Sequence, residues 1–292
     1  MPERIAIVTG ANNGLGFETT IGLVSKKIKV IMACRNIDKA EQAKTLILTT
    51  HPTAELEVME LDLTSLQSVR SFAAKYLANH QRIDLLINNA GVMIPPFGKT
   101  KEGFETQMGV NYFSHFLLTL LLLPLLNQTK GSRIVSLSSI AHKSAIIDFN
   151  NLNSEHTYSK SKAYGQSKLA CLIFAYELDR KLKKAGSGVM SVAAHPGVSN
   201  TNLFQYAPKI IKALSFLIVP FFTHSPEQAA LPSLNAALGK NVKGGEFYGP
   251  TGFNDMKGIP GLAKSSTISH DKTIAEKLWA VSEELTNCRF SL

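Results

Sequence analysis

Short apolar segments alternate with helix-length amphipathic segments, and this alternation constrains the fold more than any other feature of the chain. The apolar segments are unbroken and rich in β-branched residues, as expected for strands that are buried on both faces. They are Ile5–Thr9, Lys29–Cys34, Leu56–Asp62, Ile83–Ala90, Arg133–Ser139 and Met190–His195. Segments such as Asp38–Leu48, Ser65–Ala78 and Gly165–Leu182 have helical periodicity instead. The pattern predicts an α/β fold, a doubly wound parallel sheet of about seven strands with helices on both faces.

We expect a single domain over residues 1–292, because no linker, repeat or low-complexity segment interrupts the chain. In such a sheet, ligands bind at the carboxyl ends of the strands. Residues 198–225 follow the sixth expected strand and contain the apolar and aromatic run "NLFQYAPKIIKALSFLIVPFF". This segment is expected to be a loop or helix extension that covers the substrate.

Charge and cysteine content argue against several classes of function. Lys and Arg outnumber Asp and Glu by 31 to 22, but the positive residues are scattered, and no basic tract has the interleaved aromatics of a nucleic-acid binder. Cys34, Cys171 and Cys288 are too widely spaced for a disulfide framework or a zinc site. The start "MPERIAIVTG" lacks the architecture of a signal peptide or membrane anchor. We therefore expect no metal and no nucleic-acid partner, and a location in the cytoplasm, peripheral to a membrane, or in an organelle.

Two apolar runs, Phe116–Leu126 and Ile210–Phe222, are both too short to span a membrane. The first is expected to be a core helix or a subunit contact, which is compatible with a homodimer or homotetramer. The second is expected to be core or an apolar lid that also touches lipid.

A glycine-rich turn, "VTGANNGLG", follows the first expected strand and opens a helix. Its glycines are Gly10, Gly14 and Gly16, a G-x-x-x-G-x-G spacing that differs from the standard dinucleotide fingerprint. Glycines allow the backbone to approach a pyrophosphate closely, and a helix N-terminus supplies N–H donors and a positive dipole end. The turn therefore predicts a phosphate-binding site.

The end of the second expected strand indicates which dinucleotide is bound. An acidic residue there would hold the ribose 2′-hydroxyl of NAD, whereas Arg35 stands at this position in "MACRN". A guanidinium can bind a 2′-phosphate through two hydrogen bonds. We therefore predict NADP(H), with NAD(H) as the alternative. Asp62 ends the third strand and is expected either to accept from the adenine amino group or to cap the next helix, a role for which Ser65 competes.

The motifs "TGANNGLG", "NNAG", "VNYFSHFLLT", "IVSLSS", "YGQSK" and "HPG" occur in this order. In this combination the chain resembles the short-chain dehydrogenases/reductases, up to about Thr201. The motifs "ACRN" and "SSIAH…YSKSKAYGQSKLA" are similar to the branch of retinol dehydrogenases and protochlorophyllide reductase-like enzymes. The resemblance implies a Rossmann-type fold and an NADP-dependent oxidoreductase that interconverts carbonyls and alcohols.

The pattern Tyr-x-x-x-Lys occurs twice, as Tyr158 with Lys162 and as Tyr164 with Lys168. Helical periodicity follows Tyr164, whereas Tyr158 lies in a polar stretch. The family pattern also places its pair directly before such a helix. We therefore predict that Tyr164 and Lys168 are catalytic and that Tyr158 is a loop residue near the substrate entrance.

The resemblance also implies the remaining site residues. Ser139, with Ser138 as the alternative, would orient the substrate oxygen, and Asn111 would hold a proton-relay water near the lysine. His195 and Asn88 are expected to be structural. The expected cofactor-binding residues are Gly10, Asn12, Asn13, Gly14, Leu15, Gly16, Arg35, Asn36, Asp62, Leu63, Asn89, Ala90, Gly91, Tyr164, Lys168, Pro196, Gly197 and Thr201.

The chemistry explains why these groups are needed. Reduction of a carbonyl requires a hydride for carbon and a proton for oxygen. A phenol is a weak base at neutral pH, and a neighbouring ammonium favours its phenolate form. The protein would supply placement, while the nicotinamide carries the hydride.

Two other classes of function compete with this interpretation. A non-catalytic NADP(H)-binding sensor protein would keep the glycine-rich turn, but such proteins generally lose the Tyr–Lys pair. A sugar-nucleotide epimerase or dehydratase has a different glycine spacing. The apolar segment after Thr201 predicts a hydrophobic substrate, such as a retinoid, steroid or lipid aldehyde, although ordinary core packing would explain it equally well.

Overall fold

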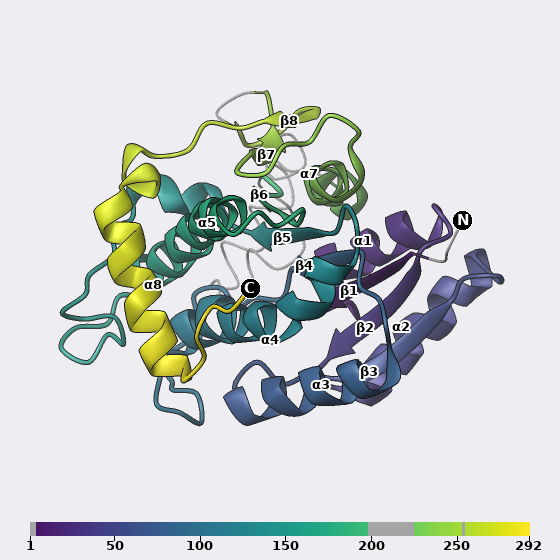
Figure 1. Cartoon of the computed structure of the whole chain (residues 1–292), viewed down its shortest axis with the longest axis horizontal. Helices are drawn as coiled ribbons and strands as arrows, with labels where there is room; N and C mark the ends of the chain where they lie inside the picture. Colours follow the sequence, from purple (N-terminus) through teal and green to yellow (C-terminus); the bar gives the residue numbers. More distant parts are fainter. Residues whose placement is uncertain (1–3, 198–224, 253–254) are drawn as a thin grey trace, which may run out of the picture.

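The computed structural model describes residues 4–197, 225–252 and 255–292, and its strands form one sheet with helices on both faces (Figure 1). The strand order is β3-β2-β1-β4-β5-β6-β7-β8. β8 is antiparallel to β7, while the other neighbouring pairs are parallel. The strands are β1 (Ile5–Thr9), β2 (Lys29–Cys34), β3 (Leu56–Glu60), β4 (Leu85–Asn88), β5 (Arg133–Leu137), β6 (Met190–Ala194), β7 (Phe247–Pro250) and β8 (Pro260–Leu262).

The doubly wound parallel sheet expected from the sequence is confirmed, with two differences. Four expected strands extend past the observed ends, because their last residues leave the sheet and enter loops that remain buried or half-buried. The sheet also contains β7 and, at its edge, β8, neither of which is among the six segments expected from the sequence. Reversal of the strand order between β1 and β4 creates the topological switch point at which such sheets bind ligands.

The helices form two layers. α3, α4 and α5 pack in the core cluster on one face of the sheet, where α8 lies over α4 and α5. α1, α2 and α7 cover the other face (Figure 1). Their bounds are α1 (Gly14–Val24), α2 (Ile37–Thr50), α3 (Leu66–Asn79), α4 (Ser114–Gln128), α5 (Lys160–Lys184), α7 (Pro226–Leu238) and α8 (Lys272–Thr286).

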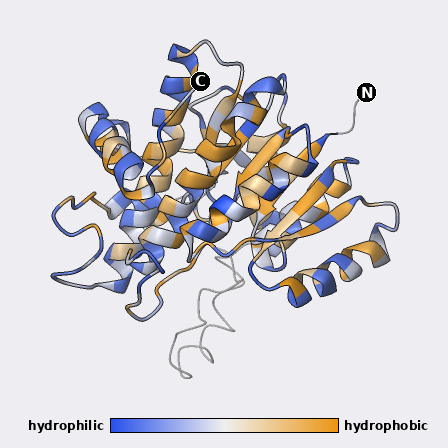
Figure 2. Ribbon diagram, turned by 60° about the horizontal axis from the view of Figure 1, so that its bottom comes forward, coloured by the Kyte–Doolittle hydropathy of each residue, from blue (hydrophilic) through white to orange (hydrophobic). Residues whose placement is uncertain are grey.

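β1 shows how one strand serves both layers. Successive side chains point to opposite faces, so Ile7 packs with α3 and α4 while Ala6 and Val8 pack with α1 and α2. All three side chains are fully buried. Figure 2 shows the result, with hydrophobic strands between helices whose outer faces are hydrophilic.

α4 continues from a π-helical turn, η1 (Met108–Phe113), and together they form one long apolar helix. The helix Met108–Gln128 is long and apolar enough to cross a membrane, but 89% of its apolar 18-residue stretch is buried inside the protein. Trp279 of α8 covers this helix, with its ring centroid 5.1 Å from that of Phe116 and 5.8 Å from that of Phe174. The apolar run is therefore core within this chain and does not itself indicate a subunit contact.

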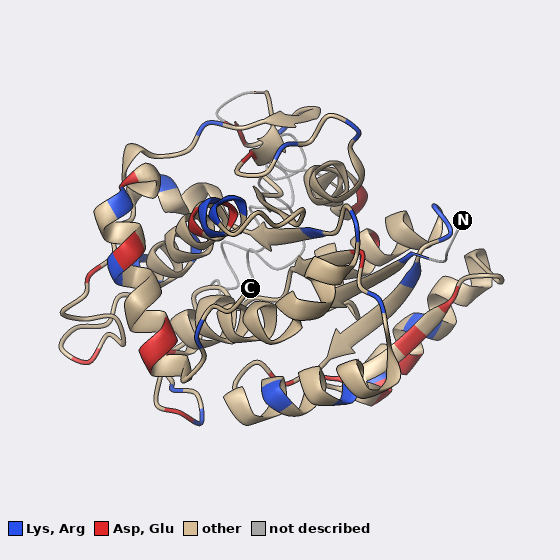
Figure 3. Cartoon of the chain, viewed as in Figure 1, with Lys and Arg blue, Asp and Glu red and all other residues tan. Residues whose placement is uncertain are grey.

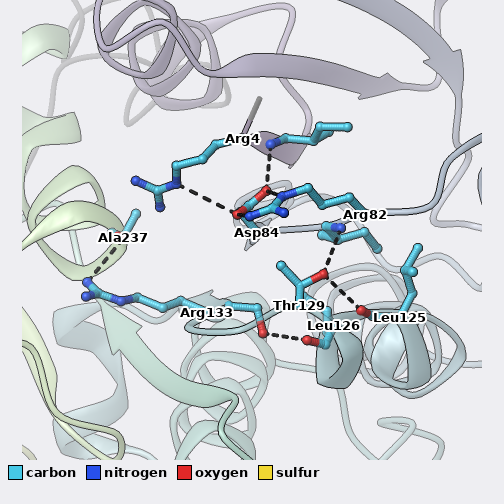
Figure 4. A network of polar contacts seen from close by, with 11 residues as sticks. Arg4, Arg82, Asp84, Leu125, Leu126, Thr129, Arg133 and Ala237 are labelled. Carbon is cyan, nitrogen blue, oxygen red and sulfur yellow. Dashed lines mark hydrogen bonds and ion pairs between the residues drawn. The ribbon is translucent and has the colours of Figure 1, made fainter. Parts of the chain in front are cut away.

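A polar network holds the amino ends of the strands at the edge opposite the switch point (Figure 4). The carboxylate of Asp84 accepts from the main-chain N–H of Ile5 at 2.9 Å and from the guanidinium of Arg82 at 2.8 Å. The guanidinium of Arg133 donates to carbonyls at the C-terminus of α7, where a positive charge complements the helix dipole. These carbonyls belong to Ala236, Ala237 and Gly239.

The excess of positive charge is not gathered in one tract. Figure 3 shows Lys and Arg on several helices and loops, alternating with Asp and Glu on α2, α5 and α8. The substrate-covering extension expected at 198–225 lies outside the described residues except for Ser225, which caps α7.

Candidate active site

A cavity of about 990 Å³ opens at the carboxyl ends of β4, β5 and β6. Its wall contains predicted site residues that are far apart in the sequence. These are Leu15, Asn89, Gly91, Ser138, Ser139, Tyr164, Lys168, Pro196 and Gly197. The other described candidates lie outside the cavity wall: in the turn between β1 and α1, in the first turn of α1, after β2 and β3, at Ala90, and in η1.

The glycine-rich turn has the strained geometry that glycine permits. Gly10 has a φ of +67°, and a Cβ there would lie 3.0 Å from the Cβ of Ala90. A Cβ on Gly16 would lie 2.2 Å from the carbonyl oxygen of Gly10, so only glycine allows this close approach. Asn13 is the N-cap residue of α1, but its side chain makes no capping hydrogen bond. The first amides of α1 are therefore open to an anion.

Thr9 connects this turn to the loop after β4. Its Oγ1 accepts from the main-chain N–H groups of Asn89 at 3.0 Å and Ala90 at 2.9 Å. The side-chain amide of Asn89 donates to the Thr9 carbonyl at 2.8 Å. The side-chain amide of Asn88, which was expected to tie strands together, links β4 to α4 instead by donating to Thr119 at 2.9 Å.

The residues after β2 and β3 lie at the same edge of the sheet. Arg35 is exposed and makes no ion pair among the described residues. The side chain of Asn36 caps α2 by accepting from the N–H of Lys39. Ser65, not Asp62, caps α3. One oxygen of the Asp62 carboxylate accepts from Thr64 instead.

Leu63 follows Asp62 and differs in character from the other cofactor candidates. Its side chain is buried in the core, and its carbonyl accepts from the Ser114 hydroxyl at 2.7 Å. Any contact of Leu63 with a nucleotide would therefore involve its main chain.

Tyr164 and Lys168 both belong to α5, one turn apart, so they share a helix face. The ammonium of Lys168 is buried, donates to the Leu137 carbonyl at 3.0 Å and lies 6.0 Å from the centroid of the Tyr164 ring. A Cβ on Gly91 would lie 3.4 Å from this ammonium and 3.1 Å from Oδ1 of Asn111. The two polar groups therefore converge behind the loop that follows β4.

The second pair has a different arrangement. Tyr158 precedes α5, so it does not share a helix face with Lys162. Its hydroxyl donates to the Pro95 carbonyl at 2.8 Å and contacts the side-chain amide of Gln107 at 3.4 Å. Tyr158 and Lys162 both line the cavity.

The two candidate serines differ in how their hydroxyls are used. Ser138 is buried and donates to the Lys168 carbonyl at 2.8 Å. Ser139 caps the short helix η2 (Ile140–Ser144) by accepting from the N–H of Ala141. Among the described residues, the Ser139 hydroxyl proton has no acceptor. Ser139 is thus the serine with a proton available to a ligand in the cavity.

Asn111 lies in η1, outside the cavity wall. Its side chain accepts from the N–H of Val92 at 2.8 Å and donates to the Ser167 hydroxyl at 2.9 Å. Its carbonyl accepts from the Cys171 thiol at 3.2 Å and is 3.0 Å from Nδ1 of His115. The relay water expected at Asn111 stays a prediction. Because two side-chain donors occupy the carbonyl, the side-chain oxygen remains as the acceptor for such a water.

Three buried histidines surround the site. Burial lowers the pKa of His115 and of His195 to about 4, and it also lowers the pKa of His142, so all three are neutral at ordinary pH. His195 accepts from the N–H of Gly197 at 3.2 Å, in agreement with its expected structural role. His142 contacts the Ser139 carbonyl through Nδ1 at 2.6 Å. The roles of His115 in α4 and His142 in η2 could not be predicted, since a single histidine gives no distinguishing local pattern.

Two further supports of the site were also missed. Gln107 is buried and binds the N–H of Ile94 at 2.9 Å and the carbonyl of Lys160 at 3.0 Å, which ties one cavity wall to the start of α5. Burial raises the pKa of the Cys34 thiol to about 11, and the thiol accepts from the main chain of Ala11 and Asn12 beneath the glycine-rich turn. Thr201 lies outside the described residues.

The sequence is similar to proteins of known families. Residues 4–210 match the family model of the short chain dehydrogenases. The chain is 40% identical over 285 residues to retinol dehydrogenase 11 of Homo sapiens, which covers 98% of this chain and 86% of that protein. It is 41% identical over 292 residues to retinol dehydrogenase 13 of Mus musculus, covering 98% and 84%.

Solved structures resemble the fold. The crystal structure of an uncharacterized protein from Mycobacterium Paratuberculosis has a TM-score of 0.83 at 38% identity and covers 99% of this chain and 95% of that chain. The Pseudomonas aeruginosa RhlG/NADP active-site complex has a TM-score of 0.67 at 23% identity, covering 84% and 93%. The second likeness concerns the fold alone.

Proposed function

The chain belongs to the short chain dehydrogenase family, in the branch that resembles retinol dehydrogenases, and from this premise we propose that it is an NADP(H)-dependent enzyme. It is an oxidoreductase that acts on carbonyls or alcohols. The proposal adds the cofactor preference, a hydrophobic substrate, and a catalytic set of Ser139, Tyr164, Lys168 and Asn111.

One arrangement carries this proposal. Ser139, Tyr164 and Lys168 line a single cavity beside Gly91, and through Leu15 and Asn89 this cavity reaches the topological switch point of the sheet. A free serine proton, a phenol and a buried ammonium on one wall are the groups that carbonyl reduction requires.

The residues at this edge fit a dinucleotide. The uncapped N-terminus of α1 would receive the pyrophosphate, and the exposed guanidinium of Arg35 would receive a 2′-phosphate. Oδ1 of Asn89 is buried without a partner among the described residues, and Asn89 lines the cavity, so it would accept from a ribose hydroxyl. When bound, the nicotinamide would supply or take up the hydride.

The side chains of the protein would handle the proton. Ser139 would donate its free proton to the substrate oxygen and so fix the position of the carbonyl. The Tyr164 hydroxyl would give a proton to this oxygen in reduction and take it up in oxidation. The Lys168 ammonium would favour the phenolate of Tyr164 and hold the nicotinamide ribose. Asn111 would anchor the water that returns the proton.

The cavity wall supports a substrate with a large apolar part. Apolar residues make up part of the cavity wall, namely Val92, Met93, Ile94, Ile140, Ala141, Ala145 and Ile146. Polar residues such as Asn151, Tyr158 and Lys162 also line it. A hydrophobic carbonyl such as a retinoid, steroid or lipid aldehyde would place its chain against the apolar residues.

A direct test follows NADPH oxidation by the purified protein with retinal, small aromatic ketones and medium-chain aldehydes. We expect kcat/KM to rise with the apolar size of the substrate, because each buried methylene contributes about 0.8 kcal/mol. Equal kcat/KM across the panel would refute the hydrophobic substrate. Binding of NADPH with no turnover of any carbonyl would favour a sensor protein, and turnover of a sugar nucleotide would favour an epimerase.

We also propose a small-molecule substrate as the main partner. Self-association as a homodimer or homotetramer, and a cytoplasmic or membrane-peripheral location, stay predictions. Sedimentation of the purified protein and fractionation of cells that express the tagged chain would test them.

A further inference from the structure

His115 forms a buried bridge between the two halves of the site. Its side chain is within α4, 4% exposed, and its two ring nitrogens contact different elements. Nε2 lies 2.9 Å from the hydroxyl of Thr9 at the end of β1, and Nδ1 lies 3.0 Å from the Asn111 carbonyl in η1. The imidazole thus connects the glycine-rich turn with the turn that carries Asn111.

The partners fix the direction of every hydrogen bond in this bridge. A carbonyl can only accept, so Nδ1 of His115 carries the proton toward Asn111. Burial, with the nearby Lys168 ammonium as a smaller cause, lowers the pKa of His115 to about 4, so the ring is neutral and Nε2 has no proton. Nε2 therefore accepts from the hydroxyl of Thr9.

The bridge continues at both ends. Beyond Thr9, the main-chain N–H groups of Asn89 and Ala90 donate to the same hydroxyl oxygen. Beyond Asn111, its side chain donates to Ser167, the neighbour of Lys168 in α5, and accepts from Val92, the neighbour of Gly91. Every donor named in this series of hydrogen bonds has an acceptor, and hydrogen bonds that are connected in this way strengthen one another.

We propose that His115 is a positioning residue that holds Asn111 in place against Thr9 and thereby aligns the cofactor loop with the catalytic helix. This inference rests on the proposed function, because Asn111 and Lys168 matter to catalysis only if the protein is the oxidoreductase described above. His115 is not among the residues that line the cavity, so it would act through Asn111.

The geometry predicts that removal of the imidazole disturbs Asn111 more than Thr9. Without His115, the Thr9 hydroxyl still has an acceptor, since the Ile87 carbonyl is 3.4 Å away, and it continues to accept from the amides of the cofactor loop. Among side-chain donors, the Asn111 carbonyl keeps only the Cys171 thiol, which is a weak donor. The catalytic side is therefore disturbed more than the cofactor side.

The first experiment compares His115→Leu and His115→Asn with the parent enzyme. His115→Leu should lower kcat by about tenfold or more, while KM for NADPH changes by less than about threefold. His115→Asn places an amide N–H near the position of Nδ1, so it should restore kcat to within about threefold of the parent. Equal kcat in His115→Leu and the parent, or equal loss in both variants, would overturn the proposal.

Matched variants separate positioning from general destabilisation. His80→Leu removes a half-buried imidazole, stacked on Tyr76 at 4.3 Å and not part of the cavity wall, so it should lower the melting temperature but leave kcat unchanged. Thr9→Val removes the hydroxyl that accepts from the cofactor loop, so it should raise KM for NADPH, and Thr9→Ser should restore it. A fall in kcat for His80→Leu as large as for His115→Leu would overturn the proposal.

An assay without turnover distinguishes failure of this inference from failure of the proposed function. In ¹⁵N NMR of the full chain with labelled histidine, the His115 ring should be protonated at Nδ1 and unprotonated at Nε2. The opposite tautomer would overturn the bridge even in an active enzyme. Full activity of Tyr164→Phe would instead overturn the proposed function, whatever the tautomer of His115.

Discussion

The hydroxyl of Tyr158 donates to the carbonyl of Pro95 at 2.8 Å, which fixes this tyrosine to the loop after β4. Its phenol therefore already has an acceptor, whereas the hydroxyl of Tyr164, which lines the cavity with Lys168, makes no hydrogen bond to the described residues.

We expect Tyr164→Phe to lower kcat by about 10²–10⁴-fold, the usual contribution of a positioned acid or base, and to leave NADPH binding nearly intact. Tyr158→Phe loses the hydrogen bonds to the Pro95 carbonyl and the Gln107 amide, each of which contributes about 1 kcal/mol to the free energy of unfolding, and should change kcat by less than about threefold. Steady-state kinetics and fluorescence titration with NADPH test both. The reverse order of the two variants would assign the acid–base role to Tyr158.

Arg35→Asp should discriminate between the two nicotinamide dinucleotides. The substitution removes a guanidinium and introduces a carboxylate that repels a 2′-phosphate, so KM for NADPH should rise by about a hundredfold. KM for NADH should change by less than about threefold, because its 2′-hydroxyl is uncharged and a carboxylate can accept from it. Lys39→Asp, on the exposed first turn of α2, makes the same change in net charge and should have little effect. Equal losses for both cofactors would refute the 2′-phosphate assignment.

Gly16→Ala should damage the phosphate-binding turn. The new Cβ would lie 2.2 Å from the Gly10 carbonyl oxygen, which is main chain and cannot move without distorting the turn. We expect NADPH affinity to fall by at least about tenfold, since overpacking shifts the backbone and costs about 1–3 kcal/mol. Gly188→Ala is the matched control, because a Cβ there meets nothing within 4 Å. Unchanged affinity in Gly16→Ala would show that the turn adapts or does not hold the phosphates.

Acid should destabilise the protein through its buried histidines. Burial lowers the pKa of His195 to about 4, whereas a histidine in the unfolded chain titrates near 6.5. Between these values the unfolded state binds a proton that the folded state does not, so the free energy of unfolding falls as the pH is lowered. At pH 5 the loss from one such histidine is about 2 kcal/mol.

His195→Asn retains an acceptor for the N–H of Gly197 but cannot be protonated. Urea unfolding at pH 7 and pH 5 should therefore show a smaller pH dependence in this variant than in the parent. The same pH dependence in both proteins would mean that His195 is not kept neutral by the fold.

Most of the sheet could be predicted because burial on both faces produces a strong and simple signal. β1 and β2 agree with the expected bounds at both ends, and the disagreements elsewhere lie at strand ends, where Asn89 and Ser139 leave the sheet to form the site. Apolar periodicity reports burial, and the loops beneath the cavity are also partly buried, so it does not mark where a strand stops.

β8 was missed because Pro260 and Gly261 are residues typical of turns. Proline is tolerated there because an edge strand has one side without a hydrogen-bonding partner strand. α5 begins at Lys160, earlier than expected, since its polar first turn has no apolar face to produce a periodic signal. In these places tertiary contacts, rather than local preference, decide the structure.

The candidate site could also be predicted only in part. Motifs identified Tyr164, Lys168 and Ser139, and the structure brings them to one cavity wall. The residues that support them were missed, because their roles depend on contacts between distant segments. Gln107 joins residues 94 and 160, and His115 joins Thr9 with Asn111; neither relationship has a local sequence pattern.

The position of α8 has a consequence for how the protein is made. Trp279 completes the packing of Phe116 and Phe174, so a helix that is translated after all the candidate catalytic residues is part of the hydrophobic core. A nascent chain that already contains these candidates therefore still exposes an aromatic surface until α8 has been translated. Products of a premature stop codon before Lys272 should become chaperone clients, even though they contain Ser139, Tyr164 and Lys168.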